Sequence, residues 1–351
     1  MSQTLVTGGT GFIGGHIVRQ LVQRGDDVVA TVRAGARTQD LETLGVRIAA
    51  ADVLDRRAVR RALKGAARVF HVAGAPALNL ARARSFAVNV EGTRIVLEEA
   101  LRAGVQRVVL TSSVAAIGPA PTGTSADETL PWQAGQHHIP YLDAMHEAEL
   151  VAQRLAARGL PVVIVNPAHT LGAPAGTAGR LGSSAGVVRA VMRRELPVYV
   201  EGTLNVVGVT DVARGHLLAD ERGAVGERYI LGNRNMTVTR LLSNLGRLAD
   251  VEPPLIRVPL PVALAVAQSA RRAGLDALPR AVEIRTAAMN WAVVNRKARR
   301  DLGWRPGPHE DCLEATVAWL REHEPRRVAR PGTRQPRALR LTGAVMRRAG
   351  L

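Results

Sequence analysis

A cluster of four glycines near the amino terminus is the first group of residues with a recognisable chemical use. The four are Gly8, Gly9, Gly11 and Gly14. They lie between an apolar run at residues 4–6 and a helical pattern at residues 17–22, which predicts a strand, a tight turn and a helix. Without side chains such a turn can approach a pyrophosphate closely, and the free N–H groups of the helix attract its charge. The sequence therefore predicts a dinucleotide-binding turn, with contacts from Gly8, Gly11, Phe12, Ile13 and Gly14.

The polar residues that follow the next two expected strands are expected to contact the adenosine half of the dinucleotide. Arg33 stands roughly twenty residues beyond the glycines, where an NAD-selective site has an acid for the ribose hydroxyls. A guanidinium there suits a 2′-phosphate, and Arg37 follows it closely, so the pair favours NADPH over NADH. The alternative is two surface arginines in an arginine-rich chain. Asp52, followed by Val53, is expected to accept from the adenine amino group or to cap the helix that begins near Arg56.

The elements that position these residues follow from the hydrophobic pattern. Short apolar runs alternate with helical patterns at residues 27–32, 46–50, 69–72, 105–110 and 160–165. The runs are continuous rather than alternating, which is typical of strands whose two faces are both covered. The pattern predicts an α/β fold with a doubly wound parallel sheet of the Rossmann type. Ligands of such a sheet bind at the carboxyl ends of its strands.

The residue composition and the hydrophobic pattern change after residue 167, which suggests that the chain is divided into regions. We expect a dinucleotide-binding Rossmann domain at residues 1–167, to which residues 204–218 return. A smaller substrate-binding region is expected at residues 168–203 and 219–324, and a basic tail at residues 325–351. Residues 172–186 are rich in Gly, Ala and Ser and are expected to form a loop or lid. The tail is expected to be disordered as far as Arg337 and then to form a short basic helix.

Composition limits the classes of protein and of site. Cys312 is the only cysteine, so neither an intramolecular disulfide nor a cysteine-rich metal site can form, and a cytoplasmic location without a bound metal is expected. The apolar stretch at residues 258–267 is interrupted by Pro259 and Pro261, so no transmembrane segment is predicted, and no secretory signal is recognisable. The net charge is +17, and eight arginines without an acid lie in residues 325–351. We expect a solvated surface rather than a nucleic-acid partner.

Several further motifs carry a resemblance that spans nearly all of residues 3–324. Besides the glycine turn, they are Ala51-Asp52-Val53, Val69-Phe70-His71-Val72-Ala73-Gly74, Asn89-Val90-Glu91-Gly92-Thr93, Thr111-Ser112-Ser113, Pro140-Tyr141, Ala148-Glu149, Asn166-Pro167 and Val209-Thr210-Asp211-Val212-Ala213. The chain resembles the extended short-chain dehydrogenase/reductases of the NAD-dependent epimerase/dehydratase family. Within that family it is similar to dihydroflavonol-reductase-like and hopanoid-associated sugar-epimerase-like members. The motifs are specific for the superfamily and much less specific for a substrate.

The resemblance assigns chemical roles to named residues. It implies that Ser113 hydrogen-bonds a carbonyl oxygen of a small-molecule substrate and that Tyr141 exchanges a proton with it while the nicotinamide exchanges hydride. It implies further contacts around the cofactor by Ala73, Gly74, Asn89, Thr111, Tyr141 and Pro167. It also implies a homodimer formed through the helices at residues 85–103 and 141–158.

The sequence departs from the family pattern at the residue that follows the tyrosine by one helical turn. The family's Tyr-x-x-x-Lys becomes Tyr141-Leu142-Asp143-Ala144-Met145. Met145 shares a helix face with Tyr141, so the site loses an ammonium that would hydrogen-bond the nicotinamide ribose and lower the pKa of the phenol. His146 is rotated by about 100° around the helix and is a poor substitute. Other residues that could take the place of the lysine are His137, His138 and His169. The alternative is that these are loop histidines without a role.

The missing lysine affects the two directions of the reaction unequally. A tyrosine near its reference pKa of about 10 is protonated at pH 7 and remains a competent acid. Oxidising an alcohol needs the phenolate, of which only about one part in a thousand exists at that pKa. Because an epimerase must oxidise before it reduces, we expect an NADPH-dependent ketoreductase-like enzyme that uses Tyr141 as acid and Ser113 as donor. The alternatives are a nucleotide-sugar epimerase or dehydratase, and a catalytically silent NADP-binding protein.

Overall fold

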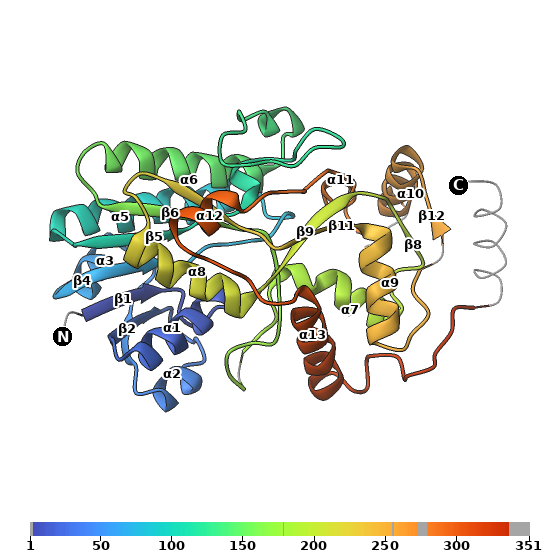
Figure 1. Cartoon of the computed structure of the whole chain (residues 1–351), viewed down its shortest axis with the longest axis horizontal. Helices are drawn as coiled ribbons and strands as arrows, with labels where there is room; N and C mark the ends of the chain where they lie inside the picture. The colour runs from blue at the N-terminus through green and yellow to red at the C-terminus, as the bar shows by residue number, and fades with distance from the viewer. Residues whose placement is uncertain (1–2, 178, 255, 273–278, 337–351) are drawn as a thin grey trace.

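A seven-stranded parallel sheet forms the larger part of the molecule (Figure 1). The computed structural model describes residues 3–177, 179–254, 256–272 and 279–336. The strand order is β10-β6-β5-β4-β1-β2-β3, with β10 at Arg228–Leu231, β6 at Val162–Pro167, β5 at Arg107–Thr111, β4 at Ala66–His71, β1 at Gln3–Thr7, β2 at Asp27–Val32 and β3 at Arg47–Ala50. Every pairing in the sheet is parallel. The expected doubly wound α/β fold is confirmed, and each of the apolar runs between residues 27 and 165 overlaps a strand of this sheet.

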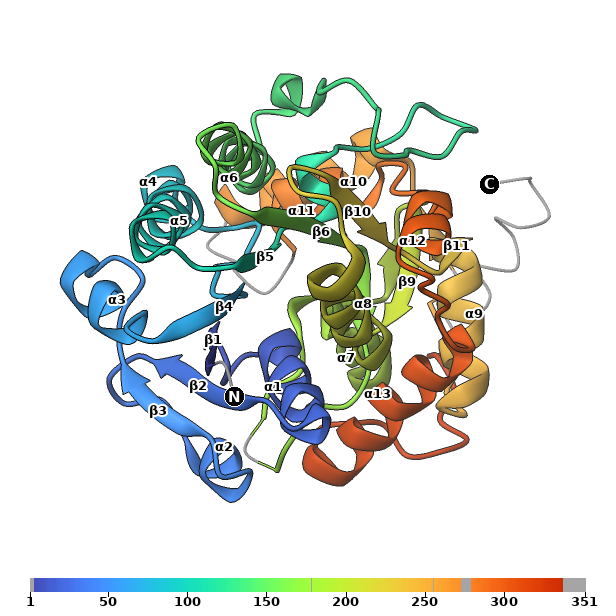
Figure 2. The same cartoon turned by 60° about the vertical axis from the view of Figure 1, so that its left-hand side comes forward.

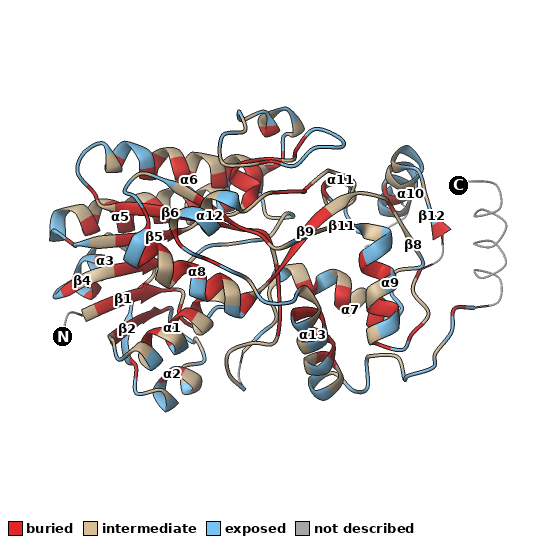
Figure 3. Ribbon diagram, in the orientation of Figure 1, coloured by how far each residue is buried: buried red, intermediate tan, exposed pale blue. Residues whose placement is uncertain are grey.

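Helices cover both faces of the sheet, as Figure 2 shows from the side. One face carries α3 at Arg56–Ala62, α5 at Gly92–Ala103 and α6 at Pro140–Ala156, while the other carries α1 at Phe12–Arg24 and α8 at Val209–Arg222. Successive residues of β1 serve opposite cores, since Leu5 packs with the α5 side and Val6 with the α1 side. Strand β6 is buried along its whole length, and β1, β4 and β5 are buried over most of theirs, which explains the apolar runs in their sequences (Figure 3).

Shorter helices join these elements around the rim of the sheet. They are α2 at Gln39–Thr43, α4 at Arg82–Phe86, the π-helical turn η1 at Ala87–Glu91, and the 3₁₀ turns η2 at Val114–Ala116 and η3 at Ala134–His137. The turns α4 and η1 run directly into α5, and α6 packs against all three. These are the helices through which a homodimer is expected, and that pairing stays a prediction.

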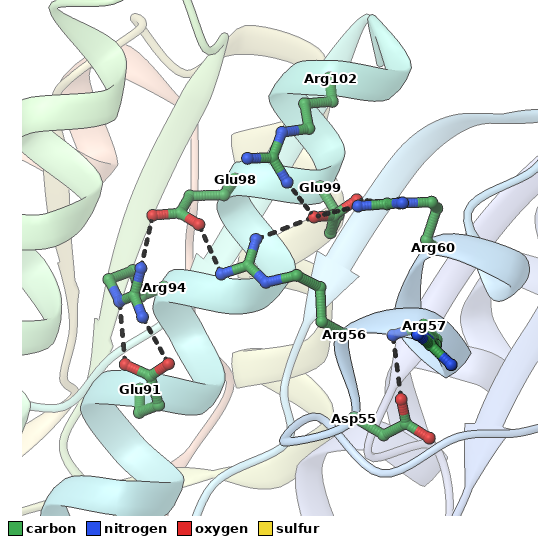
Figure 4. Close-up of polar contacts among 9 residues, drawn as sticks. All are labelled: Asp55, Arg56, Arg57, Arg60, Glu91, Arg94, Glu98, Glu99 and Arg102. Carbon is green, nitrogen blue, oxygen red and sulfur yellow. Dashed lines mark hydrogen bonds and ion pairs between the residues drawn. The ribbon is translucent and has the colours of Figure 1, made fainter.

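A charge network fixes α5 against α3 (Figure 4). The side chain of Glu99 is 1% exposed and pairs with Arg56 and Arg60 of α3, both at 2.8 Å, and with Arg102 of its own helix. These guanidiniums, with the Arg60 hydrogen bond foremost, lower the pKa of the Glu99 carboxyl to about 2. The carboxylate therefore stays charged over the physiological range, and the network holds the helix that leads out of the Asn89 turn.

The smaller region lies at the carboxyl ends of the large sheet (Figure 1). It contains a three-stranded sheet in the order β11-β9-β7 and a strand pair, β8 with β12. Its strands are β7 at His169–Leu171, β8 at Val198–Tyr199, β9 at Thr203–Gly208, β11 at Arg234–Thr237 and β12 at Ile256–Arg257. Its helices are η4 at Ser183–Ala185, α7 at Gly186–Arg193, α9 at Val238–Leu248, α10 at Leu260–Arg272, α11 at Ala281–Ala287 and α13 at His309–His323. Helix α12 at Arg296–Asp301 instead packs against β10 of the large sheet.

Two segments differ from the expected division of the chain. Strand β9 pairs with β7 and β11, so of residues 204–218 only helix α8 packs on the large sheet, against β5, β6 and α1. Strand β10 comes from the expected substrate region but extends the large sheet beside β6. An apolar run can indicate a strand, but it does not show which sheet the strand joins.

The beginning of the basic tail also differs from expectation. Residues 325–336 form turns that lie against the smaller region, where Ala329 donates to Met192 at 2.7 Å and Gln335 to Glu252 at 2.7 Å. Thr333 bridges to Val251. The short basic helix expected after Arg337 falls on residues 337–351, outside the described residues. In the described part of the chain, no helix combines the length and the hydropathy that a membrane span requires.

Candidate active site

A cleft of about 250 Å³ opens at the carboxyl ends of β1, β4, β5 and β6. It is lined by thirteen of the residues that the sequence singles out, namely Gly8, Gly11, Phe12, Ile13, Gly14, Ala73, Gly74, Asn89, Thr111, Ser113, Tyr141, Met145 and Pro167. They come from segments as far apart as residues 8 and 167, so the parallel sheet brings them together. Arg33, Arg37, Asp52 and Val53 lie outside this lining.

The glycine turn is packed too closely for any side chain. Gly8 has a φ of +73°, and a Cβ on it would lie 2.8 Å from the amide nitrogen of Ala73. A Cβ on Gly14 would lie 2.1 Å from the carbonyl oxygen of Gly8. The turn therefore needs glycine at both positions and leaves the start of α1 open to a ligand, as the strand–turn–helix motif predicts.

A buried histidine that the sequence gave no role ties the glycine turn to the end of β4. The Thr7 hydroxyl accepts from the amides of Val72 and Ala73 at 3.1 and 3.2 Å, and it lies 2.7 Å from Nδ1 of His71. The other ring nitrogen of His71 lies 3.1 Å from the Thr93 hydroxyl. Burial lowers the pKa of His71 to about 4, so the ring is neutral. The network fixes the Ala73 side of the cleft without bringing a charge into it.

Asn89 and Thr111 are held by similar buried contacts. Asn89 accepts from the amide of Ala75 at 2.8 Å and donates to its carbonyl at 3.3 Å, which joins η1 to the loop after β4. The Thr111 hydroxyl lies 2.8 Å from Nε2 of His216, whose other nitrogen faces the carbonyl of Val212 at 2.8 Å. Burial lowers the pKa of His216 to about 4, so this second histidine is also neutral.

Ser113 and Tyr141 meet inside the cleft. Ser113 follows β5 in an extended conformation, and its hydroxyl accepts from the amide of Ala115 at 3.1 Å. Tyr141 is the second residue of α6, which starts at Pro140. Burial raises the pKa of the Tyr141 phenol above its ordinary value, and a hydrogen bond with Ser113 offsets part of that rise. The phenol is therefore protonated at neutral pH and can act as an acid.

Met145 lies one turn along α6 from Tyr141 and lines the same cleft, with 9% of its surface exposed. The thioether thus faces the space beside the phenol, where the family pattern has a lysine. His146 turns away, because its ring stacks on Trp132 at 4.1 Å and lines a different hollow on the other side of α6. His169 is absent from the cleft lining, and burial lowers its pKa to about 4, so it supplies no cation. His137 and His138 are also absent from that lining.

The lining of the cleft is uncharged. Among the residues that the structure describes, it contains no Asp, Glu, Lys, Arg or His side chain. Its apolar members include Phe12, Pro76, Met145 and Pro167, while its polar members are hydroxyls and the Asn89 amide. A ligand group beside Tyr141 therefore meets hydrogen-bond donors and apolar surface but no compensating charge.

The residues expected at the adenosine half occupy the rim beyond the cleft. Arg33 and Arg37 are exposed after β2, and neither guanidinium has a partner among the described residues. The Asp52 carboxylate accepts from the amide of Leu54 at 2.9 Å. The cap of α3 is Asp55, which accepts from the amides of Arg57 and Ala58, so the interpretation of Asp52 as that cap is wrong. Two acids three residues apart both suit a cap, and the sequence does not distinguish them.

Residues 172–182, apart from 178, form a strap that crosses the outer side of the glycine turn. The Thr177 amide and hydroxyl bond the Asp40 carboxylate at 3.1 and 3.2 Å, and Ala173 contacts His16 at 2.9 Å. Gly182 lies so close to Phe12 that a Cβ on it would be 2.6 Å from the ring. The expected loop thus covers the cleft at the start of α1.

Comparison with known proteins agrees with this geometry. The model of the NAD dependent epimerase/dehydratase family matches residues 4–232. The chain belongs to that family. A Synechocystis protein provisionally named dihydroflavonol 4-reductase is 33% identical over 333 residues, 91% of this chain and 94% of its own length. Sterol demethylase protein B of Methylococcus capsulatus is 32% identical over 332 residues, covering 91% and 98% of the two chains. The crystal structure of gox2253 has a TM-score of 0.79 at 33% identity, covering 92% and 99%.

As a member of this family of extended short-chain dehydrogenase/reductases, the chain is an NAD(P)-dependent oxidoreductase that acts on a small molecule. The cleft fits a dinucleotide on two grounds of its own. The glycine turn leaves a cradle that no side chain could share. In addition, the buried hydroxyl of Ser112 has no hydrogen-bond partner among the described residues, which is typical of a site that a polar ligand completes.

We expect Gly8→Ala to weaken NADPH binding at least tenfold, because the new Cβ would force Ala73 away from the turn. Because the backbone at Gly8 is left-handed, alanine there should also lower the free energy of unfolding by about 1–2 kcal/mol. Gly25→Ala is the matched control, since Gly25 has a φ of +90° with open space around it. It should lose stability from the backbone alone and bind NADPH normally. Equal binding by the two variants, measured by calorimetry, would show that the cradle is not used.

Proposed function

We propose that the chain is an NADPH-dependent reductase of an uncharged, largely apolar carbonyl compound. The observation that carries the proposal is the absence of a charged side chain from the described lining of the cleft that holds Ser113 and Tyr141. The pyrophosphate of the cofactor is met by the backbone N–H groups at the glycine turn, so a nucleotide sugar would need a second site for its own diphosphate, and the described lining offers no arginine or lysine for one. An apolar ketone needs only hydrogen bonds at its oxygen and apolar surface elsewhere. The Synechocystis relative is named as a reductase, which supports reduction as the reaction.

The proposed roles follow from the protonation states in the cleft. A dinucleotide held at the glycine turn would supply the hydride for the carbonyl carbon, whose C=O electron pair would pass to the oxygen. The Tyr141 phenol gives its proton to that oxygen, and the Ser113 hydroxyl donates a hydrogen bond to it. The phenolate left behind takes a proton from solvent. The proton transfer to the carbonyl oxygen thus starts from Tyr141 in the form that burial favours, which is the protonated one.

The reverse direction is disfavoured by the same environment. Alcohol oxidation requires the phenolate before the hydride leaves, and no cation among the described residues lines the cleft to stabilise it. At the reference pKa the phenolate fraction at pH 7 is about one part in a thousand, and burial makes it smaller. An epimerase passes through such an oxidation in every turnover. The site therefore suits net reduction better than redox-neutral chemistry on sugars.

A panel of apolar ketones, assayed by NADPH consumption, tests this function. We expect turnover of at least one ketone and a loss of about 10²–10⁴-fold in kcat for Tyr141→Phe, since the proton donor is removed. NADPH should still bind this variant. Epimerisation of a nucleotide sugar without net cofactor consumption would contradict the proposal. A Tyr141→Phe enzyme with full activity would do so as well.

We further propose that Arg33 and Arg37 select NADPH by contacting its 2′-phosphate. Both guanidiniums are exposed at the rim next to β2 and have no partner among the described residues. Removing both in Arg33→Ala/Arg37→Ala should weaken NADPH binding roughly tenfold or more per contact and leave NADH binding unchanged. Arg158→Ala, which removes an exposed charge at the far end of α6, is the control. An equal loss of affinity for NADH and for NADPH would show that the two arginines do not contact the 2′-phosphate.

A further inference from the structure

A buried amide joins the strand end that carries Ser113 to the helix that carries Tyr141. Asn166 is fully buried near the end of β6. Its Nδ2 atom donates to the carbonyl oxygen of Ser113 at 3.0 Å and to Oε1 of Glu149 at 2.5 Å. Glu149 belongs to α6 and lies about two turns after Tyr141. One side chain on β6 thus bonds both elements that present the two proposed catalytic groups.

Glu149 is itself fixed from the opposite side. It is 1% exposed, and its Oε2 atom pairs with Nη1 of Arg228 on β10 at 3.1 Å. The same guanidinium donates to the carbonyl oxygen of Glu128 at 2.9 and 2.5 Å. The carboxylate therefore has a separate partner for each oxygen, and its orientation toward Asn166 is determined. A buried ion pair of this kind contributes little net stability, so its position needs another explanation.

We propose that Glu149 and Asn166 are positioning residues, which set the separation of Ser113 and Tyr141 by linking the end of β5 to α6. This inference rests on the proposed function for the roles of Ser113 and Tyr141. The link acts on the Ser113 backbone, while the Ser113 hydroxyl stays free to meet the phenol. Catalysis is sensitive to such spacing, because a shift of about 1 Å at a reacting group can cost about 100-fold in rate.

The other contacts of Ser113 do not replace this link. Its carbonyl oxygen also accepts from the Ala116 amide at 3.0 Å, but Ala116 belongs to the same turn and moves with it. The Ser112 amide donates to Val165 at 2.8 Å and holds β5 to β6, without reaching α6. Ala116 also reaches α6, because its carbonyl oxygen lies 3.3 Å from Nδ1 of His146. The path through Asn166 and Glu149 differs in starting at the Ser113 carbonyl oxygen itself and in passing through two side chains that are at most 1% exposed.

Two double variants test the inference without leaving a buried charge unpaired. Glu149→Gln/Arg228→Met removes the ion pair but keeps an amide oxygen that accepts from Asn166. Glu149→Leu/Arg228→Met removes the ion pair and the acceptor together. We expect kcat within about threefold of wild type for the first and about 30-fold lower for the second, with the same Kd for NADPH in both. Equal kcat values for the two variants, compared well below both Tm values, would overturn the proposal.

A spectroscopic readout separates this test from the proposed function. The Tyr141 phenol titration can be followed by ultraviolet absorbance, using the matching Tyr141→Phe variant as the blank. If the link positions Ser113, loss of the acceptor should raise the pKa of Tyr141 further, because the Ser113 hydrogen bond that lowers it is weakened. The Glu149→Gln/Arg228→Met variant should titrate like wild type. Identical titrations in both variants would overturn the inference even if no substrate had been found.

Discussion

Enclosure of the Tyr141 phenol among uncharged groups is the constraint on which the chemistry of this site depends. A phenol in such surroundings keeps its proton, since the phenolate would lose hydration and gain no cation in return. Met145 fills the neighbouring position on α6 with a side chain that neither donates a hydrogen bond nor carries charge. The site therefore holds the protonated phenol from which carbonyl reduction starts, and only a very small fraction of the phenolate from which alcohol oxidation would start.

The surrounding architecture keeps charge out of the cleft while holding its walls in place. His71 and His216 both contact cleft residues through hydroxyls, and burial leaves both rings neutral. The charged groups are arranged behind the walls. The Glu99 network fixes α5 against α3, and the Glu149–Arg228 pair lies behind Asn166. Polar contacts of this kind fix the shape of the cleft. They place no positive charge where the family pattern has the lysine ammonium.

Local sequence patterns were sufficient to predict the glycine turn, the strands β1 to β6 of the large sheet and the helix face shared by Tyr141 and Met145. These features depend on spacing within about ten residues, which periodicity and turn chemistry report directly. The assignment of β9 to the second sheet was missed, because a strand pattern carries no information about its partner. The histidine networks and the Asn166 bridge were also missed. They join residues far apart in the chain, and single buried polar residues give no signal until the fold places them together.

The most direct test of the central claim compares the pH dependence of the two reaction directions in wild type and in Met145→Lys. With a protonated phenol as the acid, wild-type ketone reduction should be nearly constant from about pH 6 to 9, while alcohol oxidation should rise about tenfold per pH unit over the same range. The lysine should shift the oxidation profile to lower pH. Wild-type oxidation that is already at its maximum near pH 7 would contradict the account.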